Sequence, residues 1–494
     1  MNRLQMLIVA LLAGMTPIIF PSLVDLGGDA YYHYTLIQAF SEQFWQGDLF
    51  PRWCSSCEGG LGSPAFAFYF PLPYWISAML YPQCKMLGFS IEQHYLLAAW
   101  LACACAFAGC YAWLRLSVSH KLALAGAFLY LWMPYRAELL FQRSAFAELW
   151  GMAFLPWVFW GITHLARKEY RYAMPTCFFM AAMILSHAPL ALLAIGAGLL
   201  FVMFATRLDV AAAGIYTLCA ALAVGMTAFY WMPAKAMMPF LNQEALTLVA
   251  DSWVNNFIDQ KRTNPHDIFD FMVLAATICF LLLAAIRQLF HWKAYATQTQ
   301  GDEGKAWLYT AVVCFAMMFS FTAPVWEILD PKGAFSSPWR IQALLSAFAV
   351  YFLIIFYAWF ASQKQLKTSV YDGLALLLLL VLLGSSQLLA RPPELNGAYE
   401  KTIAARLVGF PEYQSRWVKH YDFADRQRIV DEAQQSLPRI QGAGNITPDI
   451  HEWNADSIRF TVKLDKQTDI ILRHNYFPTW QASANGKPIE LLPS

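Results

Sequence analysis

Long apolar segments separated by short polar loops run along the chain as far as Arg391. Most approach the roughly 20 residues that an α-helix needs to cross a bilayer. The segments lie at about 1–21, 92–114, 121–134, 145–165, 171–187, 188–206, 211–232, 269–288, 306–322, 341–361 and 371–390. This pattern predicts a polytopic α-helical membrane protein with about eleven transmembrane helices.

A further apolar segment, at 64–85, is interrupted by four prolines: Pro64, Pro71, Pro73 and Pro82. Proline lacks a backbone N–H, so a straight helix through this segment would leave carbonyl groups without donors in lipid. We therefore expect a re-entrant or interface-lying hairpin here rather than one transmembrane helix.

Beyond Arg391 the chain becomes polar and its hydrophobic period shortens. Apolar and polar residues alternate in SIRFTVKLD at 457–465 and in TDIILRH at 468–474, as in half-buried strands. Asn485-Gly486 then gives a strong hairpin-turn signal. The predicted organisation is a transmembrane domain at 1–391, with a first extracytoplasmic loop at 25–63, and a small β-containing extracytoplasmic C-terminal domain at 392–494.

Composition agrees with membrane embedding. Hydrophobic residues make up 58% of the chain and charged residues 14%, whereas soluble domains carry about 25% charged residues. The net charge of +1 leaves no basic excess for binding nucleic acid. The sequence has no Walker loop, Rossmann glycine set, Gly-x-Ser-x-Gly elbow or zinc signature, so ATP hydrolysis, NAD chemistry and serine-hydrolase catalysis lack support.

Lysine and arginine clusters predict the orientation, because cytoplasmic loops are enriched in both. With a cytoplasmic N-terminus, and with 64–85 not crossing the membrane, the basic loops fall on the cytoplasmic side: 115–121, 167–171, 207, 287–305 and 364–367. The first apolar segment lacks a small-x-small cleavage pattern, so we expect a retained anchor. The C-terminus and most of the unusual acidic and basic residues are then extracytoplasmic.

Cys54 and Cys57 form a lone C-x-x-C in a polar loop, whereas most of the other cysteines lie in apolar runs. A zinc site would need a second pair nearby, and no matching pair exists. A local disulfide is favoured if the loop faces an oxidising compartment.

The first candidate for chemistry is Asp29, in the motif GGDAYYHY directly after the first apolar segment. An acid at the membrane surface, beside Tyr32 and His33, could act as a general base or hold a divalent cation that binds phosphate. The same pattern also fits a helix N-cap followed by an aromatic belt. Both interpretations stay open on the sequence alone.

Further candidates begin or end apolar segments. Glu148 opens one of them, where an acid is costly unless it is paired or used, and Arg143 lies five residues before it. His187, in SHAP, is expected at the apex of a tight hairpin, as an acid, a base, a phosphate donor or a satisfied turn residue.

Two arginines stand beside tryptophans. Arg52 lies in the long first loop, and Arg340 follows Trp339 near serine hydroxyls. Arg340 could clamp a lipid phosphate or diphosphate, or it could anchor the helix by extending its charge to the interface.

The order of these motifs resembles that of the pyruvoyl-tetrahydropterin-synthase-related bacterial membrane proteins and, more distantly, the YfhO-like family. The motifs are GDLFPRW at 47–53, GLGSPAFAFYFPLPY at 60–74, RSAFAE at 143–148, HAP at 187–189, SPWR at 337–340 and YFPTW at 476–480. Both families look like members of the GT-C superfamily, which are multi-spanning glycosyltransferases that use polyprenyl-phosphate-linked sugars.

The resemblance implies a glycosyltransferase of the bacterial cytoplasmic (inner) membrane. It would transfer a sugar from a polyprenyl-phosphate-linked donor to an envelope glycan, lipid or protein. GT-C enzymes place an essential acid in the first extracytoplasmic loop, and Asp29 matches that position. The residues expected to act are Asp29, Glu148 and His187 in catalysis, with a divalent cation at Asp29 if there is one, and Arg143, Arg340, Arg52, Tyr32 and His33 in substrate binding.

A non-catalytic transporter of lipid-linked glycans, or an envelope assembly scaffold, is the alternative. A polymerase or ligase of O-antigen type is a third interpretation and would depend on the outer arginines more than on one acid. Under any of these, charges at membrane depth are costly unless they satisfy one another. We therefore expect Asp29 and at least two of Arg143, Glu148, His187 and Arg340 to line one outward-facing cavity.

Overall fold

The computed structural model describes residues 3–19, 29–242, 253–260, 298–330, 338–362, 413–418, 438–442 and 446–493. The apolar segments predicted at 269–288 and 371–390, and the predicted domain boundary after residue 391, lie outside these ranges. The chain forms two compact units. Unit 1 comprises Met1–Ala30, Leu96–Ala228 and Asp251–Pro393, and unit 2 comprises Tyr31–Tyr95, Phe229–Ala250 and Glu394–Ser494.

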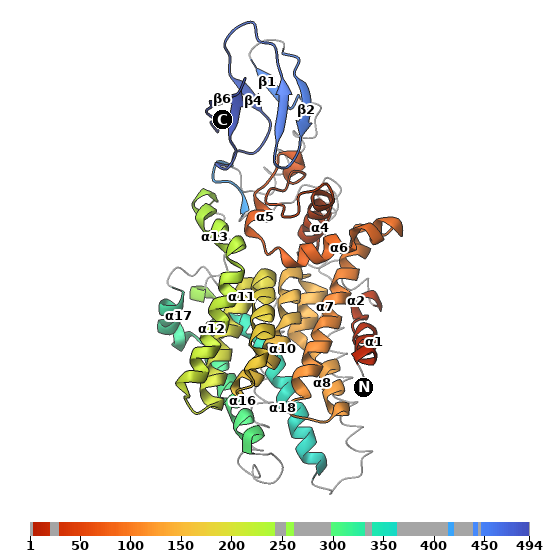
Figure 1. Cartoon of the computed structure of the whole chain (residues 1–494), viewed down its shortest axis with the longest axis vertical. Helices are drawn as coiled ribbons and strands as arrows, with labels where there is room; N and C mark the ends of the chain where they lie inside the picture. Colours follow the sequence, from red (N-terminus) through yellow and green to blue (C-terminus); the bar gives the residue numbers. More distant parts are fainter. Residues whose placement is uncertain are drawn as a thin grey trace. The chain divides into compact units, whose positions relative to one another are not determined.

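Unit 1 is helical throughout its described residues. Its longer helices are α1 (Arg3–Ala13), α7 (Ile91–Leu114, whose first turn belongs to unit 2), α8 (His120–Leu131), α10 (Phe146–Ala166), α11 (Ala173–Ala205), α12 (Val210–Met226), α16 (Gln298–Ala316) and α18 (Gln342–Ser362) (Figure 1). The shorter ones are α2 (Thr16–Ile19), α9 (Pro134–Ala137), η2 (Glu138–Gln142), η3 (Tyr170–Tyr172), η5 (Trp253–Asn255), η6 (Ser320–Thr322), α17 (Ala323–Leu329) and η7 (Pro338–Ile341).

The long helices of unit 1 follow the predicted apolar segments closely. Four helices in the described part of the chain are long and apolar enough to cross a membrane, or six if each of two bent pairs is one span. These helices are apolar on nearly all sides, which is typical of membrane spans rather than of helices at a water-facing surface.

The predicted hairpin within 171–206 turns at His187. Before the turn, Thr176 packs against Gly161 of α10, where an added Cβ would lie 2.4 Å from the threonine hydroxyl oxygen. After the turn, a Cβ on Gly198 would lie 3.2 Å from Ile162, so both halves of α11 pass the same turn of α10. His187 lies between them with a non-helical backbone (φ −164°, ψ 90°). The chain therefore reverses at His187, as the sequence predicts.

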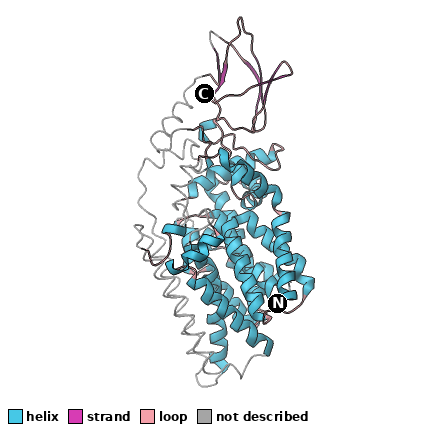
Figure 2. Cartoon of the chain, turned by 90° about the vertical axis from the view of Figure 1, so that its left-hand side faces the viewer, coloured by secondary structure: helices cyan, strands magenta, loops and turns pink. Residues whose placement is uncertain are grey.

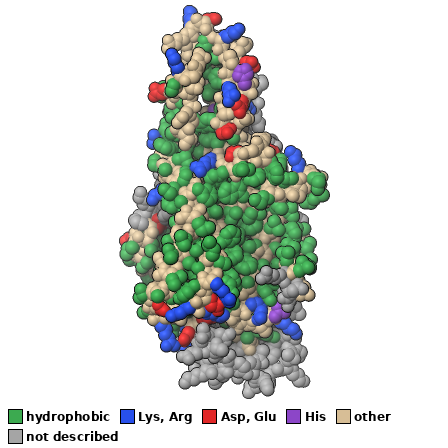
Figure 3. Space-filling view, viewed as in Figure 1, with side chains coloured by type: hydrophobic (Ala, Val, Ile, Leu, Met, Phe, Trp, Pro, Cys, Tyr) green, Lys and Arg blue, Asp and Glu red, His purple; other side chains and the backbone are tan. Residues whose placement is uncertain are grey.

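Ion pairs gather at one end of unit 1, below a surface that is mostly hydrophobic (Figure 3). They are Arg167–Glu303, Lys168–Asp209 and Arg207–Asp302, at 2.6, 2.8 and 3.0 Å. Arg167 also donates to the carbonyl of Leu116, which brings the loop at 115–121 to the same end. Four of the basic loops that the sequence assigns to one side of the membrane therefore meet: 115–121, 167–171, 207 and 287–305.

Unit 2 combines helices and strands. Its helices are α4 (Ala30–Trp45), η1 (Glu58–Gly60), α5 (Ala65–Phe68), α6 (Leu72–Met86), α13 (Ala228–Met237) and η4 (Met238–Phe240). Its strands are β1 (Ile440–Gly442), β2 (Asp449–Trp453), β3 (Ile458–Thr461), β4 (Ile470–Leu472), β5 (Ala482–Ala484) and β6 (Lys487–Ile489) (Figure 2). They pair antiparallel as β1–β4, β2–β3 and β5–β6.

Local sequence explains several of these elements. Asn485 and Gly486 have φ of 51° and 77°, the left-handed values that a two-residue hairpin turn needs, and they join β5 to β6. The proline-rich segment is broken between α5 and α6, so 64–85 is not one straight helix. How it lies relative to the membrane stays a prediction. The predicted loop at 25–63 contains α4, whose apolar side chains Leu36, Ile37 and Phe40 are almost fully buried.

The core of unit 2 joins segments that are distant in sequence. Its buried residues come from the first loop, α5, the end of η4 and the C-terminal region: Trp53, Ala67, Phe68, Leu241 and Phe477. Met237 and Trp480 pack against this cluster. The C-terminal region and the first loop therefore share one hydrophobic core.

Candidate functional site

The backbone of unit 1 departs from regular helix just before α10. α9 leads into η2, a five-residue π-helical turn. Ser144 then adopts a left-handed conformation with φ of 49°. Such π-turns and left-handed non-glycine residues are costly and cluster at functional sites. This segment carries Arg143 and leads directly to Glu148.

Glu148 lies in the first turn of α10, and its side chain is only 2% exposed. The hydroxyl of Tyr135 donates to Oε1 at 2.5 Å, and Nη1 of Arg340 donates to Oε2 at 2.6 Å. Nη1 of Arg143 lies 3.6 Å from the same Oε2. Burial and the charge of Glu148 together raise the pKa of Tyr135 well above its ordinary value, so the phenol keeps the proton that it donates. Both oxygens of the carboxylate are thus engaged.

Trp339 contacts both arginines. The Cζ atoms of Arg143 and Arg340 are each 4.8 Å from the centre of its ring, and the ring of Tyr135 lies 6.0 Å away. Arg340 and Trp339 belong to η7, which opens α18. A guanidinium over an aromatic face is attracted to it, so the indole restricts where the two charges can lie.

His187 faces the same carboxylate from the turn of α11. Its Nε2 lies 3.9 Å from Oε2 of Glu148, too far for a hydrogen bond. The N–H of Leu190 donates to Nδ1 at 3.2 Å. A neutral imidazole with Nδ1 as acceptor carries its proton on Nε2, so the N–H of His187 faces the carboxylate.

Asp29 is joined to this cluster through the backbone. Its N–H donates to the carbonyl of Arg143 at 2.9 Å, and its carboxylate acts on the charge of Arg143. Asp29 also directly precedes α4, which is the N-cap position. The position of Asp29 is therefore compatible with both interpretations, as an acid of the site and as a helix cap.

Two guanidinium groups of the cluster stay partly accessible. The side chains of Arg143 and Arg340 are 20% and 17% exposed. Arg340 pairs with Glu148, and the charges of Glu148, Glu138 and Asp29 act on Arg143. Nη1 of Arg143 is buried and has no hydrogen-bond partner among the described residues. An anion could reach the exposed parts of both guanidinium groups and bind between them.

The donor set around Asp29 does not fit a divalent cation. Among the described residues, no three side chains of histidine, cysteine, aspartate or glutamate come together. The guanidinium of Arg143 acts on Asp29, and the oxygens of Glu148 already bind Arg340 and Tyr135. Cations prefer several free oxygen ligands.

Three further predicted residues belong to unit 2. His33 is fully buried, and its Nδ1 lies 2.8 Å from the hydroxyl of Tyr74. Burial lowers its pKa to about 3, so its ring is neutral. Tyr32 is half-buried in α4. Arg52 donates to the carbonyl of Phe229 at 3.3 Å. A substrate-binding role for these residues stays a prediction.

Sequence reasoning did not single out Tyr135 or Trp339 as site residues. Each is adjacent to an arginine in the sequence, Arg136 and Arg340 respectively. Their roles depend on which way each aromatic ring points, which only the fold determines. An aromatic residue beside an outward arginine is the one signal that could have found them.

The fold and this cluster define a class: a multi-spanning helical protein with a largely buried cluster of charged residues at the ends of its helices. The sequence matches, over residues 66–391, the family described as the 6-pyruvoyl-tetrahydropterin synthase related domain, a membrane protein family. The match covers more than half of the chain. The protein therefore belongs to this family of membrane proteins.

The solved structures to which this chain is similar include the oligosaccharyltransferase of Archaeoglobus fulgidus. Its apo form is 13% identical, with a TM-score of 0.47, over 84% of this chain and 60% of that one, and its form tethered to an acceptor peptide gives the same values. The same archaeal enzyme, AglB, in complex with an inhibitory peptide and a dolichol-phosphate, is 12% identical, with a TM-score of 0.42, over 88% and 60%. The chain thus spans about 60% of their length. No curated protein matches it.

Proposed function

We propose that the protein is a glycosyltransferase of the bacterial cytoplasmic membrane that takes a sugar from a polyprenyl-phosphate carrier. The single observation that carries this proposal is that two partly exposed guanidinium groups, those of Arg143 and Arg340, converge on Glu148. Two converging guanidinium groups suit a lipid phosphate, and the lipid chain suits the apolar helices on which the cluster stands. The order of sequence motifs from Asp29 to Trp480 supports the same class of enzyme.

In this proposal, Asp29 removes the proton from an acceptor hydroxyl. The hydroxyl oxygen forms a bond to the anomeric carbon, and the bond from that carbon to the phosphate oxygen breaks. The lipid phosphate leaves with the bonding electrons, and Arg143 and Arg340 stabilise its developing charge. Glu148 holds the two guanidinium groups in place, and the N–H of His187 faces the same carboxylate.

The orientation of the protein in the membrane is part of what we propose. The cluster lies at the end of α10 opposite to the ion pairs formed by Arg167 and Lys168. If the basic loops are cytoplasmic, the cluster is extracytoplasmic, where envelope glycans, lipids and proteins are available as acceptors. The disulfide between Cys54 and Cys57 fits an oxidising extracytoplasmic compartment for the first loop.

Substitution of Asp29 separates an enzyme from a carrier. In Asp29→Asn we expect sugar transfer to be lost, while binding of undecaprenyl phosphate by the protein in nanodiscs stays within about threefold. Arg143→Gln and Arg340→Gln should each weaken that binding at least tenfold. Mass spectrometry of envelope glycans from cells that carry each variant reports turnover.

The alternative, a non-catalytic transporter of lipid-linked glycans or an assembly scaffold, makes a different prediction. A carrier needs the arginines but no general base, so its Asp29→Asn variant would leave the envelope glycans unchanged. That result would overturn the catalytic role of Asp29. If neither arginine variant changed binding of the lipid phosphate, the anion site itself would be wrong.

A further inference from the structure

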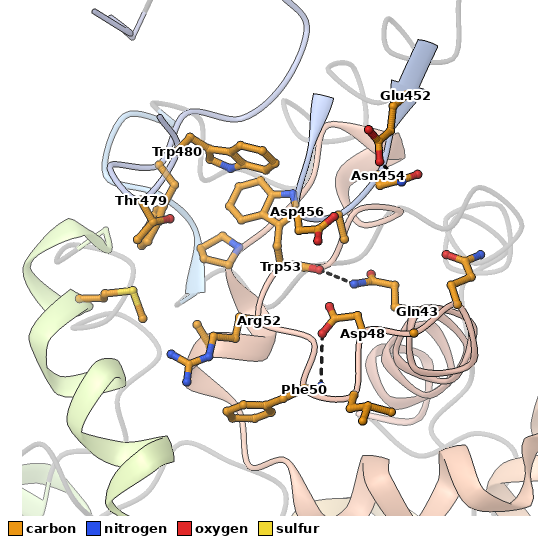
Figure 4. A pocket seen from close by; sticks show the side chains of 18 residues that line it. Gln43, Asp48, Phe50, Arg52, Trp53, Glu452, Asn454, Asp456, Thr479 and Trp480 are labelled. Atoms are coloured by element: carbon orange, nitrogen blue, oxygen red, sulfur yellow. Dashed lines mark hydrogen bonds between the residues drawn. The ribbon is translucent and has the colours of Figure 1, made fainter. Parts of the chain in front are cut away.

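A cavity of about 990 Å³ lies within unit 2, between the first loop and the C-terminal strands (Figure 4). It is at the upper end of the volumes typical of ligand pockets, about 300–1,000 Å³. Its aromatic walls include Trp53 and Trp480, and its polar walls include Asp48, Asp456 and Glu452. None of these residues belongs to the cluster around Glu148.

Aromatic contacts fix the orientation of the two indoles. The ring of Trp53 stacks on that of His474 at 5.0 Å. Trp480 meets Trp53 edge-on at 5.7 Å and meets His474 edge-on at 4.8 Å. Trp480 is therefore held on two sides before any ligand arrives. A wall that is already ordered loses little conformational entropy on binding.

Covalent and hydrogen bonds hold the first loop in the same way. The disulfide Cys54–Cys57 closes a tight turn next to Trp53. The backbone N–H and side-chain amide of Asn475 donate to the carbonyls of Leu61 and Gly62 at 2.8 and 2.7 Å. These bonds connect the first loop to the C-terminal region beside the cavity.

The polar walls are acidic. Three carboxylates line the cavity, and one of them, that of Glu452, pairs with Arg459 at 3.4 Å. The guanidinium in the cavity wall is that of Arg52, which lies over the ring of Phe50 at 4.8 Å and donates to a backbone carbonyl. Burial raises the pKa of Asp48, and the charge of Asp456 raises it further, so these two carboxylates face the same space. An anionic ligand such as a lipid phosphate would be repelled here.

The ligand that fits such walls carries many hydroxyls and no negative charge. Carboxylates and the side-chain amides of Gln46 and Asn454 bind hydroxyl groups, and indole faces cover the apolar C–H faces of sugar rings. A single sugar is too small to fill the cavity. We propose that this cavity binds a neutral oligosaccharide, which, if the proposed function holds, is the glycan acceptor.

The test uses the full chain in nanodiscs and isothermal titration with neutral hexasaccharides of glucose, N-acetylglucosamine, mannose and galactose. We expect at least one of them to bind. Trp480→Ala and Asp456→Asn should each weaken that binding at least tenfold, which is about 1.4 kcal/mol. Trp480→Phe keeps an aromatic wall and should stay within about threefold.

Matched controls come from the same region of unit 2. Trp453, in β2, and the exposed Asp465 do not line the cavity, so Trp453→Ala and Asp465→Asn should bind like the native protein. Asp29→Asn should also bind normally, because Asp29 is not part of the cavity. This last variant separates failure of the cavity proposal from failure of the proposed function.

Three results would overturn the inference. The first is that no neutral hexasaccharide binds, and the second is that one binds but Trp480→Ala and Asp456→Asn do not weaken it. The third is that an oligolysine peptide binds with the expected dependence on Asp456 while no sugar does, which would assign the acidic walls to a basic peptide. A heparin hexasaccharide should bind more weakly than its neutral counterparts.

Discussion

Replacing Glu148 by glutamine tests whether the carboxylate holds the charged cluster together. The amide introduced by Glu148→Gln could still accept the hydrogen bond from Tyr135, but it would have no charge to offer Arg143 and Arg340. The N–H donors of that amide would also face the guanidinium donors. The variant therefore removes the charge with little change of shape.

The expected loss follows from the distances. At an effective dielectric of 20, charges separated by 2.6 and 3.6 Å attract by about 6 and about 5 kcal/mol before desolvation. Much of this offsets the cost of burying the groups, so the net loss is closer to the roughly 3–5 kcal/mol measured when one partner of a buried pair is removed. We expect the Glu148→Gln variant in detergent to unfold at a clearly lower denaturant concentration than the native protein, as measured by circular dichroism.

Two other ion pairs of unit 1 provide a comparison for the size of this loss of stability. Glu303→Gln removes the partner of Arg167 alone, so it should cost less than Glu148→Gln. Asp302→Asn breaks the exposed pair with Arg207 and should cost under about 1 kcal/mol. If Glu148→Gln were no more destabilising than Asp302→Asn, the electrostatic account of the cluster would be wrong.

Two predictions concern unit 2. Burial lowers the pKa of His474 from 6.5 to about 4, so between these pH values the unfolded chain binds more protons than the folded one. The contribution of His474 to the free energy of unfolding should therefore be complete above about pH 6.5. It should fall by up to about 3 kcal/mol as the pH drops to about 4. Tryptophan fluorescence during unfolding at several pH values measures this. His474→Phe should reduce the loss by this contribution, while the buried His33, whose pKa is also lowered, keeps part of the dependence. Replacing Cys54 and Cys57 by serine should cost about 2 kcal/mol, the loop-closure value for so short a loop, and the loss should match that of the native protein in reductant.

The sequence predicts the helices of unit 1 well because an apolar stretch of span length has few alternatives. The segments predicted at 92–114 and 145–165 appear as α7 and α10 within one residue. The turn at His187 and the broken path at 64–85 follow from histidine and proline in otherwise apolar runs. In each case a local physical rule is sufficient.

The sites depend on contacts between distant segments, which no local rule supplies. Arg143 and Glu148 could be paired from their spacing, but Arg340 is 192 residues from Glu148. The cavity of unit 2 is even harder to predict from the sequence. Its first-loop half, with Asp48 and Arg52, stands out in the sequence, whereas its C-terminal half, with Asp456, does not.

The two sites expose groups of opposite charge, and this difference has a consequence for a transferase. Beside Glu148 two partly exposed guanidinium groups converge, whereas around Trp480 carboxylates line the cavity. A lipid phosphate is attracted by the cluster around Glu148 and repelled by the cavity around Trp480. A neutral glycan has no net charge, so its binding depends on groups that bind hydroxyls and on indole faces. A transferase must bind a charged donor and an uncharged acceptor at different places. Electrostatics alone can keep the donor out of the cavity around Trp480. Reversing the charge of the cavity with Asp456→Lys should therefore let undecaprenyl phosphate compete with a hexasaccharide, whereas the native protein should show no such competition.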